Sequence, residues 1–404
     1  MQSFTSKNLA KLDRSTWEVV RFGDVVKEVR ETSQDHIADG IDHVVGLEHL
    51  SPLDIHIRSW GNIANSTTFS RRFRKGQVLF GRRRAYQRKA AIANFDGICS
   101  GDIIVMEAIE DKLDPNLLSF LVHSEGFYNW AVSTSAGSLS PRTKFKSLAE
   151  YEFRLPPRDV QKKLAELLWV VDEVRESLVL SMKRITKYKK ISIKNLYSCG
   201  IGHVKFKDTE IGIIPEEWNV VKLSEVADVS TGNSAPQSPD YFKNGAYPFC
   251  RTSDVGRVHI SENLTDIADY LNEQGIKGLN LFKKGTILIP KSGASTFLNH
   301  RVVLGIDSYV SSHLATVLAD DKKIITKYLF NIVCFIDARN LTNNPDYPSL
   351  RTENIKEIKV ALPKINEQKA IVEIIDKIDN SLEAIKNNIK SIENLRNVII
   401  NSIF

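Results

Sequence analysis

Apolar residues recur every seven positions along two long segments of the chain. Near the end of the chain one series is formed by Ile371, Ile378, Ile385, Ile392 and Ile399. A second series there has the same period, is interrupted by Arg396, and contains Ile375, Leu382, Ile389 and Ile403. A less regular stripe in the middle of the chain contains Leu164, Leu168, Val171, Leu178, Met182 and Ile185. Sustained heptads predict coiled-coil helices, and Pro156, Pro157 and Pro363 mark where these helices begin.

Each predicted helix runs for about 40 residues, or roughly 60 Å. Neither helix can bury its stripe alone. We expect the two helices of one chain to pair antiparallel, which would give a pseudo-two-fold axis between the two halves. Two other arrangements stay open, in which each helix folds back on its own domain or pairs with a second copy of the chain.

The segments before each stripe have a different pattern, in which short apolar runs alternate with turn residues. We predict strands over Gln77–Phe80, Ile103–Met106, Thr286–Ile289 and Thr316–Leu318. Helical periodicity predicts helices over Leu117–Trp130 and Lys327–Phe335. The fold class is therefore α/β in the mixed α+β sense, with two similar globular domains joined by two long helices.

An internal repeat of about 200 residues supports this division. Short patterns return in the same order: Trp17–Phe22 as Trp218–Leu223, Phe73–Leu79 as Phe282–Leu288, Arg142-Thr143 as Arg351-Thr352, and Leu155-Pro156 with Gln161-Lys162 as Leu362-Pro363 with Gln368-Lys369. We therefore predict domains at residues 1–156 and 205–364, each followed by a helix, at residues 157–204 and 365–404.

Composition narrows the class of protein. The 404 residues are 42% hydrophobic and 26% charged, which is typical of a globular chain. The four cysteines form no CxxC pair, so a zinc ribbon or disulfide framework is not indicated. The first residues lack the apolar core of a signal peptide, and no apolar run approaches the roughly 18 residues of a membrane span. We expect a cytoplasmic protein.

The net charge of +6 is modest, but basic residues cluster in the first domain. Positions 71 to 89 contain no acidic residue, and their candidate DNA contacts are Arg71, Arg72, Arg74, Lys75, Arg82, Arg83, Arg84, Tyr86, Gln87, Arg88 and Lys89. Arginine can read guanine and glutamine can read adenine in the major groove, while any basic side chain can hold phosphate. The predicted strand Gln77–Phe80 lies between the two clusters, so we expect both at one edge. The alternative is a solvated charged face.

The second domain is less basic and has more polar residues in its loops. Its candidate DNA contacts are Asn233, Gln237, Arg251, Lys291, Ser292, Asn299, His300 and Arg301. Different side chains at matching places predict that the two domains read different base sequences.

Searches for catalytic motifs return two weak matches. Asn344-Pro345-Asp346-Tyr347 resembles an adenine-methyltransferase motif but lacks its second proline and a glycine-rich loop upstream. Pro345-Asp346 with Glu357-Ile358-Lys359 fits a metal-nuclease pattern, but Glu357–Leu362 leads directly into the coiled coil. His43, His49 and His56 fit no zinc spacing, and we interpret them as surface or hydrogen-bonded polar residues. No catalytic residue and no metal ligand is predicted.

Taken together, the motifs resemble the specificity subunits of Type I restriction–modification enzymes. In the first domain the resemblance rests on Val45–Leu50, Phe73–Phe80 and Phe95–Ser100 with Asp102-Ile103. In the second it rests on Ile213–Trp218, Thr231-Gly232 and Tyr247–Phe249 leading to Arg251 and Asp254. The leucine–proline segments before both Gln-Lys pairs look like the family's entry into its helices, although Val160 stands where the second copy has Glu367.

The resemblance implies a non-catalytic, sequence-specific DNA-recognition subunit. Each domain would read one half of a split asymmetric site, and the helices would set the spacer between the halves. The implied partners are double-stranded DNA, two methyltransferase (modification) subunits that methylate one adenine in each half, and restriction subunits that translocate and cut DNA. S-adenosylmethionine, ATP and Mg²⁺ would lie on these partners and no cofactor on this chain. A stand-alone DNA-binding regulator and a metal-dependent nuclease are the alternatives.

Overall fold

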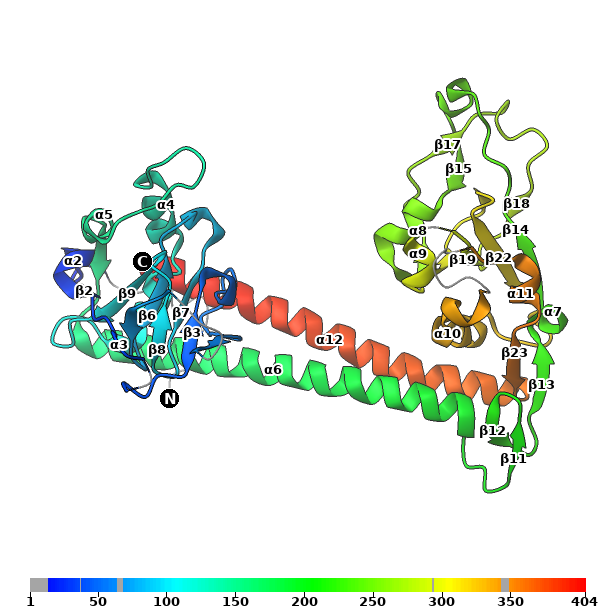
Figure 1. Cartoon of the computed structure of the whole chain (residues 1–404), viewed down its shortest axis with the longest axis horizontal. Coiled ribbons are helices and arrows are strands. Elements are labelled where there is room, and N and C mark those ends of the chain that lie inside the picture. Colours follow the sequence, from blue (N-terminus) through cyan, green and yellow to red (C-terminus); the bar gives the residue numbers. More distant parts are fainter. Residues whose placement is uncertain (1–13, 37, 64–67, 293, 343–348) are drawn as a thin grey trace. The chain divides into compact units, whose positions relative to one another are not determined.

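The protein divides into two compact units in the computed structural model (Figure 1). The structure describes residues 14–36, 38–63, 68–292, 294–342 and 349–404. Unit 1 comprises residues 1–182 and 385–404, and unit 2 comprises residues 183–384. Each unit contains sheets and segments of both long helices, α6 (Arg158–Cys199) and α12 (Ile365–Ile403).

Unit 1 is built on two four-stranded sheets and a two-stranded ribbon. The first sheet has the order β2 (Val26–Val29), β9 (Ile103–Ala108), β6 (Val78–Gly81) and β7 (Ala90–Ile92). The second has the order β4 (Gly61–Asn62), β3 (His43–Val45), β8 (Gly97–Cys99) and β5 (Arg71–Phe73). The ribbon pairs β1 (Glu18–Arg21) with β10 (Glu152–Leu155). The predicted strands at 77–80 and 103–106 are confirmed as β6 and β9.

Short helices cover the sheets of unit 1: α2 (Phe22–Val25), α3 (Pro115–Leu121), α4 (Glu125–Ser133), α5 (Phe145–Ala149), η1 (Leu47–His49) and η3 (Ala85–Gln87). The single helix predicted over Leu117–Trp130 is wrong, because α3 and α4 are separate. Ser124 is extended and its Oγ accepts from the Phe127 backbone N–H at 3.3 Å, so it starts a new helix as an N-cap.

Unit 2 repeats this architecture. One sheet has the order β14 (Ala227–Thr231), β22 (Leu314–Ala319), β19 (Ile287–Pro290), β20 (Arg301–Leu304) and β16 (Ile260–Leu264). The other has the order β17 (Tyr270–Leu271), β15 (Tyr247–Cys250), β21 (Ser308–Val310) and β18 (Leu281–Phe282). Two ribbons pair β13 (Asn219–Lys222) with β23 (Lys359–Leu362) and β11 (Phe206–Thr209) with β12 (Gly212–Pro215). The strands predicted at 286–289 and 316–318 are confirmed.

The helices of unit 2 are α7 (Leu223–Val226), α8 (Thr252–Val258), α9 (Ala294–Phe297), α10 (Thr326–Phe335) and α11 (Thr352–Lys356), with the short turns η4 (Pro239–Phe242) and η5 (Ala338–Leu341). The helix predicted over Lys327–Phe335 is confirmed as α10. Its buried face, which includes Tyr328, Leu329 and Val333, packs in one core with Trp218 and with Ile371 and Ile375 of α12.

Equivalent strands and equivalent hydrogen bonds show that the two halves are one repeated fold. The order β2-β9-β6-β7 returns as β14-β22-β19-β20, and β4-β3-β8-β5 returns as β17-β15-β21-β18. The β3–β8 and β15–β21 pairs are both parallel. Gly76 and Gly285 lie two residues before the central strands β6 and β19, with φ of 92° and 90°, a left-handed conformation that favours glycine.

A buried glutamine fixes each long helix to its domain. Gln161 donates to the carbonyls of Lys112 and Pro156 and accepts from the Asp114 N–H. Gln368 donates to those of Lys323 and Pro363 and accepts from the Ile325 N–H. Both side chains are almost fully buried. Because the amides are satisfied in the same way, the same helix entry is used twice.

The heptad stripes face the partner helix in both units, and the helices run antiparallel. In unit 1, Leu164 and Leu168 share a core with Ile399 and Ile403, and Arg175 Nε lies 2.8 Å from Glu393. In unit 2, Ile193 shares a core with Ile371 and Ile375, and Lys189 pairs with Asp379. Arg396, which interrupts the stripe, forms a buried pair with Asp172 at 3.5 Å. The predicted pairing within one chain is confirmed.

Helix α6 stops at a glycine. Gly200 has a φ of 64° and its N–H donates to Leu196, which ends the helix in a left-handed turn.

Candidate nucleic-acid interface

Arg71, from the start of the basic run, and Arg82, from its second half, meet at the turn that joins β8 to β9. Arg71 Nη1 donates to the Ile103 carbonyl at 2.9 Å. The Arg82 backbone N–H donates to the Asp102 carbonyl at 2.9 Å, and Arg82 Nε donates to the Thr143 carbonyl at 3.1 Å. A cavity of about 460 Å³ opens beside this turn, lined by residues that include Arg71 and Asp102. The fold therefore gathers side chains separated by more than 60 residues of sequence.

Asp102 is the acidic centre of this group. Arg142 Nε donates to Asp102 Oδ1 at 2.8 Å, and Arg83 Nη1 lies 3.5 Å from Oδ2. Arg83 Nη2 also donates to Ser140 Oγ at 3.1 Å. Burial opposes ionisation of Asp102, but the hydrogen bonds and charges of Arg142 and Arg83 outweigh it and lower the pKa of the carboxyl. The group stays ionised at neutral pH. We call Arg71, Arg82, Arg83, Asp102 and Arg142 the first turn cluster.

Arg84 and Tyr86 lie in the loop that follows β6. Arg84 adopts a left-handed conformation with a φ of 54°, and its backbone N–H donates to the Pro141 carbonyl at 2.7 Å. The Nε atoms of Arg83 and Arg84 are buried and lack a hydrogen-bond partner among the described residues. Tyr86 is 57% exposed, and Gln87 is partly exposed in η3. This loop presents polar and aromatic side chains next to the first turn cluster.

The remaining basic residues lie elsewhere. Arg72 is near Asp39, Arg74 pairs with Glu31, and Lys75 is exposed next to the Asp96 turn. Arg88 pairs with Glu125 above the Tyr128 ring, and Lys89 Nζ donates to the Leu47 carbonyl at 2.7 Å. The expectation that both clusters flank one strand at an edge is wrong. Strand β6 lies between β9 and β7, and Arg74 and Arg82 lie at its opposite ends.

Unit 2 has a corresponding group around the turn that joins β21 to β22. The Lys291 backbone N–H donates to the His313 carbonyl at 2.8 Å, and Lys291 Nζ donates to Thr231 Oγ1. Burial lowers the pKa of Lys291. Ser292 Oγ lies 2.8 Å from His313 Nδ1. Asn233 and Asn280 exchange two hydrogen bonds, at 2.9 and 2.8 Å. An isolated bridge joins Ser292 to Ser349. We call Asn233, Asn280, Lys291, Ser292, His313 and Ser349 the second turn cluster.

The other candidates of unit 2 are separate from this group. Exposed Gln237 donates to the Ala235 carbonyl, and Arg251 pairs with Asp269 next to the rings of Phe242 and Phe249. Asn299 Oδ1 accepts from the Ala338 N–H at 2.8 Å.

His300 and Arg301 are buried. His300 lies 3.0 Å from His259, and Arg301 is 1% exposed and donates to the carbonyls of His300 and Ile336. Burial lowers the pKa of Arg301 to about 10. In this structure Arg301 has no free surface for DNA, and its hydrogen bond to Ile336 links β20 to the end of α10.

The two turn clusters occupy the same backbone positions. The backbone N–H groups of Arg82 and Lys291 each donate to the turn. Their carbonyls accept from the N–H groups of Thr143 and Leu350, which precede α5 and α11, at 3.0 and 2.8 Å. Isolated bridges join Arg83 to Arg142 and Ser292 to Ser349. These contacts are made by the backbone, so they do not depend on the side chains. The two domains thus present different side chains from one frame.

This frame corrects one detail of the repeat. The sequence patterns align Arg142 with Arg351, but the hydrogen bonds align Arg142 with Ser349 and Thr143 with Leu350. Arg351 instead matches Lys144, since each residue immediately precedes a short helix, α11 and α5. The Arg-Thr pair occurs in both copies, but in the second copy it lies two positions later in the fold than in the first.

The candidate site residues that sequence reasoning missed are Asp102, Arg142 and His313. Asp102 stands in the Phe95–Ile103 region and Arg142 was noticed as a repeat marker, but nothing local indicates that they meet. The basic run consists of neighbours in sequence, whereas Arg83 and Arg142 become neighbours only through an isolated β-bridge in the folded chain. A single acidic residue among arginines could be recognised only after folding.

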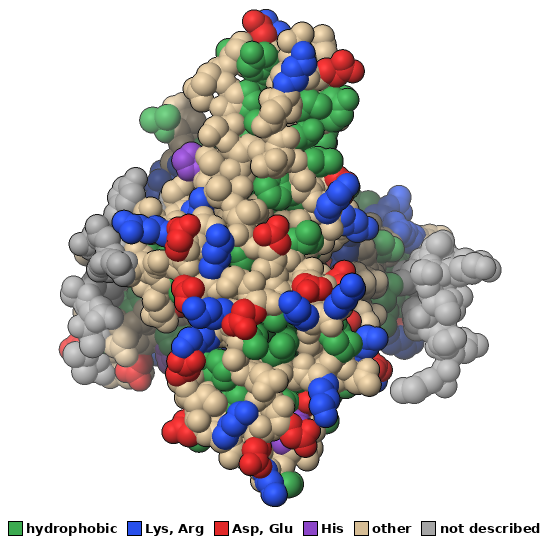
Figure 2. All heavy atoms as spheres, turned by 90° about the vertical axis from the view of Figure 1, so that its right-hand side faces the viewer, with side chains coloured by type: hydrophobic (Ala, Val, Ile, Leu, Met, Phe, Trp, Pro, Cys, Tyr) green, Lys and Arg blue, Asp and Glu red, His purple; other side chains and the backbone are tan. Residues whose placement is uncertain are grey.

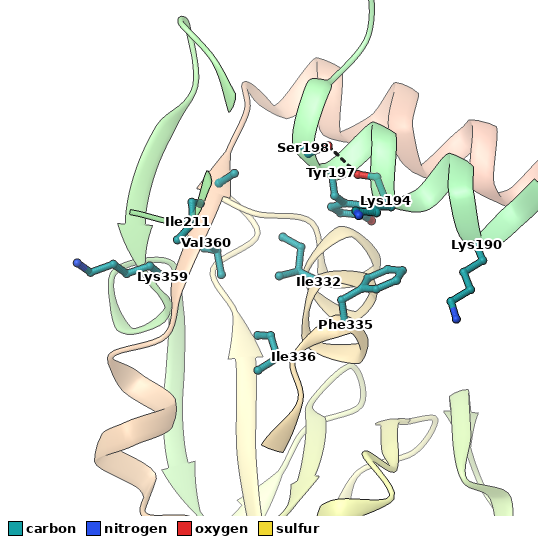
Figure 3. A pocket seen from close by; sticks show the side chains of 11 residues that line it. Lys190, Lys194, Tyr197, Ser198, Ile211, Ile332, Phe335, Ile336, Lys359 and Val360 are labelled. Atoms are coloured by element: carbon teal, nitrogen blue, oxygen red, sulfur yellow. Dashed lines mark hydrogen bonds between the residues drawn. The ribbon is translucent and has the colours of Figure 1, made fainter. Parts of the chain in front are cut away.

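An apolar cavity of about 440 Å³ lies at the end of α6 in unit 2 (Figure 3). Its lining is Lys190, Lys194, Tyr197, Ser198, Ile211, Ile332, Phe335, Ile336, Lys359, Val360 and Ala361. Figure 3 shows Ile332, Phe335 and Ile336 on one side and Tyr197 of α6 opposite them. The lining contains no carboxylate, histidine or cysteine, so the usual metal-binding side chains are absent from it. Its polar side chains are those of Lys190, Lys194, Tyr197, Ser198 and Lys359.

Neither weak catalytic motif gains support. Residues 344–347 lie outside the described part of the chain. Glu357 pairs with Lys222 at 2.7 Å, as Glu150 pairs with Arg21 at 3.3 Å in the first copy, and Lys359 pairs with Glu210. The described residues contain no cluster of three side chains suited to a metal ion.

The three histidines that fit no zinc spacing each contact another residue of unit 1. His43 stacks on Phe95, His49 Nδ1 accepts from the Gly46 N–H, and His56 Nε2 lies 2.6 Å from Asp172.

Charge is mixed over the face of the molecule seen in Figure 2. Lys and Arg side chains there are interspersed with Asp and Glu, and the upper part shows mainly uncharged and hydrophobic side chains. That face does not present a continuous basic surface, in contrast to the basic loop after β6. No helix among the described residues is long and apolar enough to cross a membrane.

Comparisons with known proteins agree with this architecture. The Type I restriction modification DNA specificity domain matches residues 14–178 and 215–394. The MjaVIII specificity subunit of Methanocaldococcus jannaschii is 25% identical, covering 95% of this chain and 91% of its own. The EcoDI specificity subunit of Escherichia coli is 25% identical over 46% of this chain and 42% of its own.

Two solved structures share the fold. The HsdS subunit from Thermoanaerobacter tengcongensis has a TM-score of 0.53 at 20% identity, covering 96% of this chain and 97% of its own. A chain from a study of complex assembly and conformational transition of the type I R-M system has a TM-score of 0.64 at 20% identity, covering 95% and 96%.

The fold and the paired clusters define a duplicated α/β protein whose two domains expose different side chains from one frame. With both of its halves matched, the chain belongs to the Type I restriction–modification DNA specificity family. It is the DNA specificity subunit of such a system, with two target recognition domains, and a non-catalytic component. The family's cofactors reside on the modification and restriction subunits, and the family implies assembly of these subunits with DNA.

Proposed function

We propose that this chain reads a bipartite, asymmetric DNA site, one half with each recognition domain. The domains would be residues 1–156 and 205–364, and the helices between and after them would fix the spacer. Two modification subunits would bind the chain and methylate one adenine in each half, on opposite strands, and restriction subunits would join them. DNA would contact the turn clusters and the loop after β6.

The observation that carries this proposal is the difference between the two turn clusters. One frame holds arginines and Asp102 in the first domain, and Lys291, Ser292 and His313 in the second. Two unlike side-chain sets on one backbone are what recognition of two unlike half-sites requires. Arginine with its planar fork suits guanine, whereas the serine and histidine can exchange hydrogen bonds with several base edges.

Methylation mapping tests the proposal. The chain is co-expressed with the modification subunit encoded beside it, and methyladenine is mapped across the host DNA. We expect a two-part motif with a fixed gap, methylated once on each strand. Absence of methylation despite a soluble complex would favour a stand-alone regulator, which direct binding to genomic fragments would then reveal.

Alanine at Arg82, Arg83 and Arg84 should relax one half of the motif by roughly tenfold or more, because one or more base contacts worth about 1–3 kcal/mol each are lost. The other half should be unchanged. A charge-matched control replaces the exposed residues Arg21, Lys27 and Arg154, which lie in unit 1 outside the basic run. Equal relaxation of both halves would contradict the assignment of one half to each domain.

A further inference from the structure

We propose that Arg142 reads a guanine in the first half-site and that Asp102 is the residue that positions it. This inference rests on the proposed function, because it names the base chemistry of the same site. Arg142 lies outside the basic run, and its part in recognition follows from the tertiary contacts of the first turn cluster.

The geometry of the Arg142–Asp102 pair leaves one edge of the guanidinium available. Nε donates to Asp102 Oδ1 at 2.8 Å and Nη2 donates to Oδ2 at 3.5 Å. The carboxylate thus occupies the edge of the guanidinium that is formed by Nε and one hydrogen of Nη2. The outer edge, formed by Nη1 and the second hydrogen of Nη2, can donate two parallel hydrogen bonds. Guanine offers two acceptors, O6 and N7, in the major groove, which match such an edge.

The carboxylate is held in place independently of DNA. Asp102 is 21% exposed, and its backbone N–H donates to Ser100 Oγ at 3.2 Å. Its carbonyl accepts from Arg82, so the turn is fixed to the end of β6. An arginine that is oriented before binding loses less side-chain entropy when it meets a base. Asp102 therefore positions Arg142 without contacting DNA itself.

The surface around the pair is accessible and positively charged. The Arg142 side chain is 46% exposed, and Leu139 in the same loop is 89% exposed. Arg83 contacts the same carboxylate from the other side, and Arg82 and Arg84 lie next to it in sequence. Two arginines pair with this one acid, and Arg82 and Arg84 add two further cations in the same loop, so the local charge attracts DNA although Asp102 is negative.

The second domain supplies an internal comparison. Its frame places Ser349 where the first has Arg142, and His313 where the first has Asp102. Neither offers an arginine fork. The inference therefore applies to the first half-site and predicts no equivalent guanine contact by the second turn cluster.

The experiment uses the full chain in complex with its modification subunit. Methylation rates are measured on oligonucleotide duplexes that carry the mapped site or a single base-pair substitution in it. The variants are Arg142→Ala, Arg142→Lys and Asp102→Asn, with Arg21→Ala as a control that also breaks exposed ion pairs in unit 1.

We expect Arg142→Ala to reduce discrimination at one G·C pair of one half-site by about 5- to 100-fold. Lysine keeps the charge but lacks the fork, so Arg142→Lys should not restore discrimination. Asp102→Asn should reduce discrimination at that same pair by a smaller factor, while binding to unrelated DNA stays equal or rises because a negative charge is lost. The Arg21→Ala control should leave discrimination unchanged at every position of the site.

Three results would overturn the inference while leaving the proposed function intact. In the first result, Arg142→Ala changes discrimination at no G·C pair of either half-site. In the second, Arg142→Ala lowers methylation equally on all sequences and Arg142→Lys restores it, which is the signature of a phosphate contact. In the third, Asp102→Asn leaves discrimination unchanged. Failure of the wild-type complex to methylate any two-part site would overturn the proposed function and this inference together. Thermal melting of each variant identifies misfolding, and Arg142→Lys and Asp102→Asn are the conservative changes that retain the test.

Discussion

At the scale of single residues, buried polar side chains that have only one available hydrogen-bond partner fix where helices and strands meet. His123 is one of them, lying between the end of α3 and the start of α4. Its Nε2 lies 3.0 Å from the Ala90 carbonyl, and its Nδ1 is buried without a partner among the described residues. Burial and the nearby Arg396 cation lower the pKa of His123 to about 4. The neutral imidazole is therefore required in the folded state.

This requirement predicts acid sensitivity. Because the folded pKa lies below the ordinary 6.5, the unfolded chain binds a proton first as the pH falls from about 6.5 to 4. The free energy of unfolding should then fall by about 2–3 kcal/mol from this residue. His123→Gln keeps a donor for the Ala90 carbonyl and does not titrate. In this variant the free energy of unfolding should therefore fall less steeply with decreasing pH, as measured by urea unfolding at pH 7, 5 and 4. Parallel slopes would contradict the prediction.

At the scale of elements, much of the fold could be predicted because its signals are local and periodic. The heptads predicted both long helices and their pairing, and apolar runs predicted β6, β9, β19 and β22. The break between α3 and α4 was missed, because apolar periodicity continues through Val122 and His123 while Ser124 starts a new helix. The candidate site was found only in part. Its basic loop is a local feature, whereas the Asp102–Arg142 pair depends on tertiary contacts between segments 40 residues apart in sequence.

The polar interruption of the helix stripe carries a prediction about stability. Arg396 and Asp172 have side chains only 7% and 2% exposed, and Arg396 Nη2 also donates to the Leu53 carbonyl at 3.1 Å. Arg396→Leu restores the apolar stripe but leaves Asp172 with His56 as its remaining partner. We expect this single change to cost about 3 kcal/mol, because a buried charge loses its counterion. The double change Arg396→Leu with Asp172→Leu should cost clearly less than the sum of the two single changes.

The equivalent pair in the other unit is the control. Lys189 and Asp379 have side chains 29% and 32% exposed, so Lys189→Leu should cost about 1 kcal/mol or less. Chemical unfolding of all variants at pH 7 measures both effects. Additive costs for Arg396 and Asp172 would show that the two side chains do not stabilise one another.

At the scale of the whole molecule, the paired helices connect the two recognition domains. From Arg175 to Lys189 is fourteen residues, and so is the interval from Asp379 to Glu393, which are their partners. The same antiparallel register therefore holds in both units. A change of seven residues in each helix keeps the stripes facing one another, whereas other changes rotate them apart.

Deleting Leu180–Thr186 together with Leu382–Asn388 should shorten the spacer of the recognised site by about three base pairs. Seven helical residues rise about 10 Å, and base pairs are spaced about 3.4 Å apart. Both half-sites should keep their sequence, because neither turn cluster is altered. Methyladenine mapping of the complex measures the gap. The full-length control carries Lys183→Ala and Arg184→Ala, and an unaltered gap in the deletion variant would refute the role of the helices in spacing.

The backbone frame beneath the turn clusters has a consequence for how such a protein changes over generations. Because main-chain groups hold Arg82 and Lys291 in place, their side chains can be replaced with little effect on folding. Under the proposed function, substitutions at these positions would change the bases that are read while the scaffold persists. Two copies of one fold carry different side chains in this way within a single chain, since Arg142 and Ser349 occupy the same place. Novel target sites would arise by drift at a few exposed positions, without the invention of a new fold.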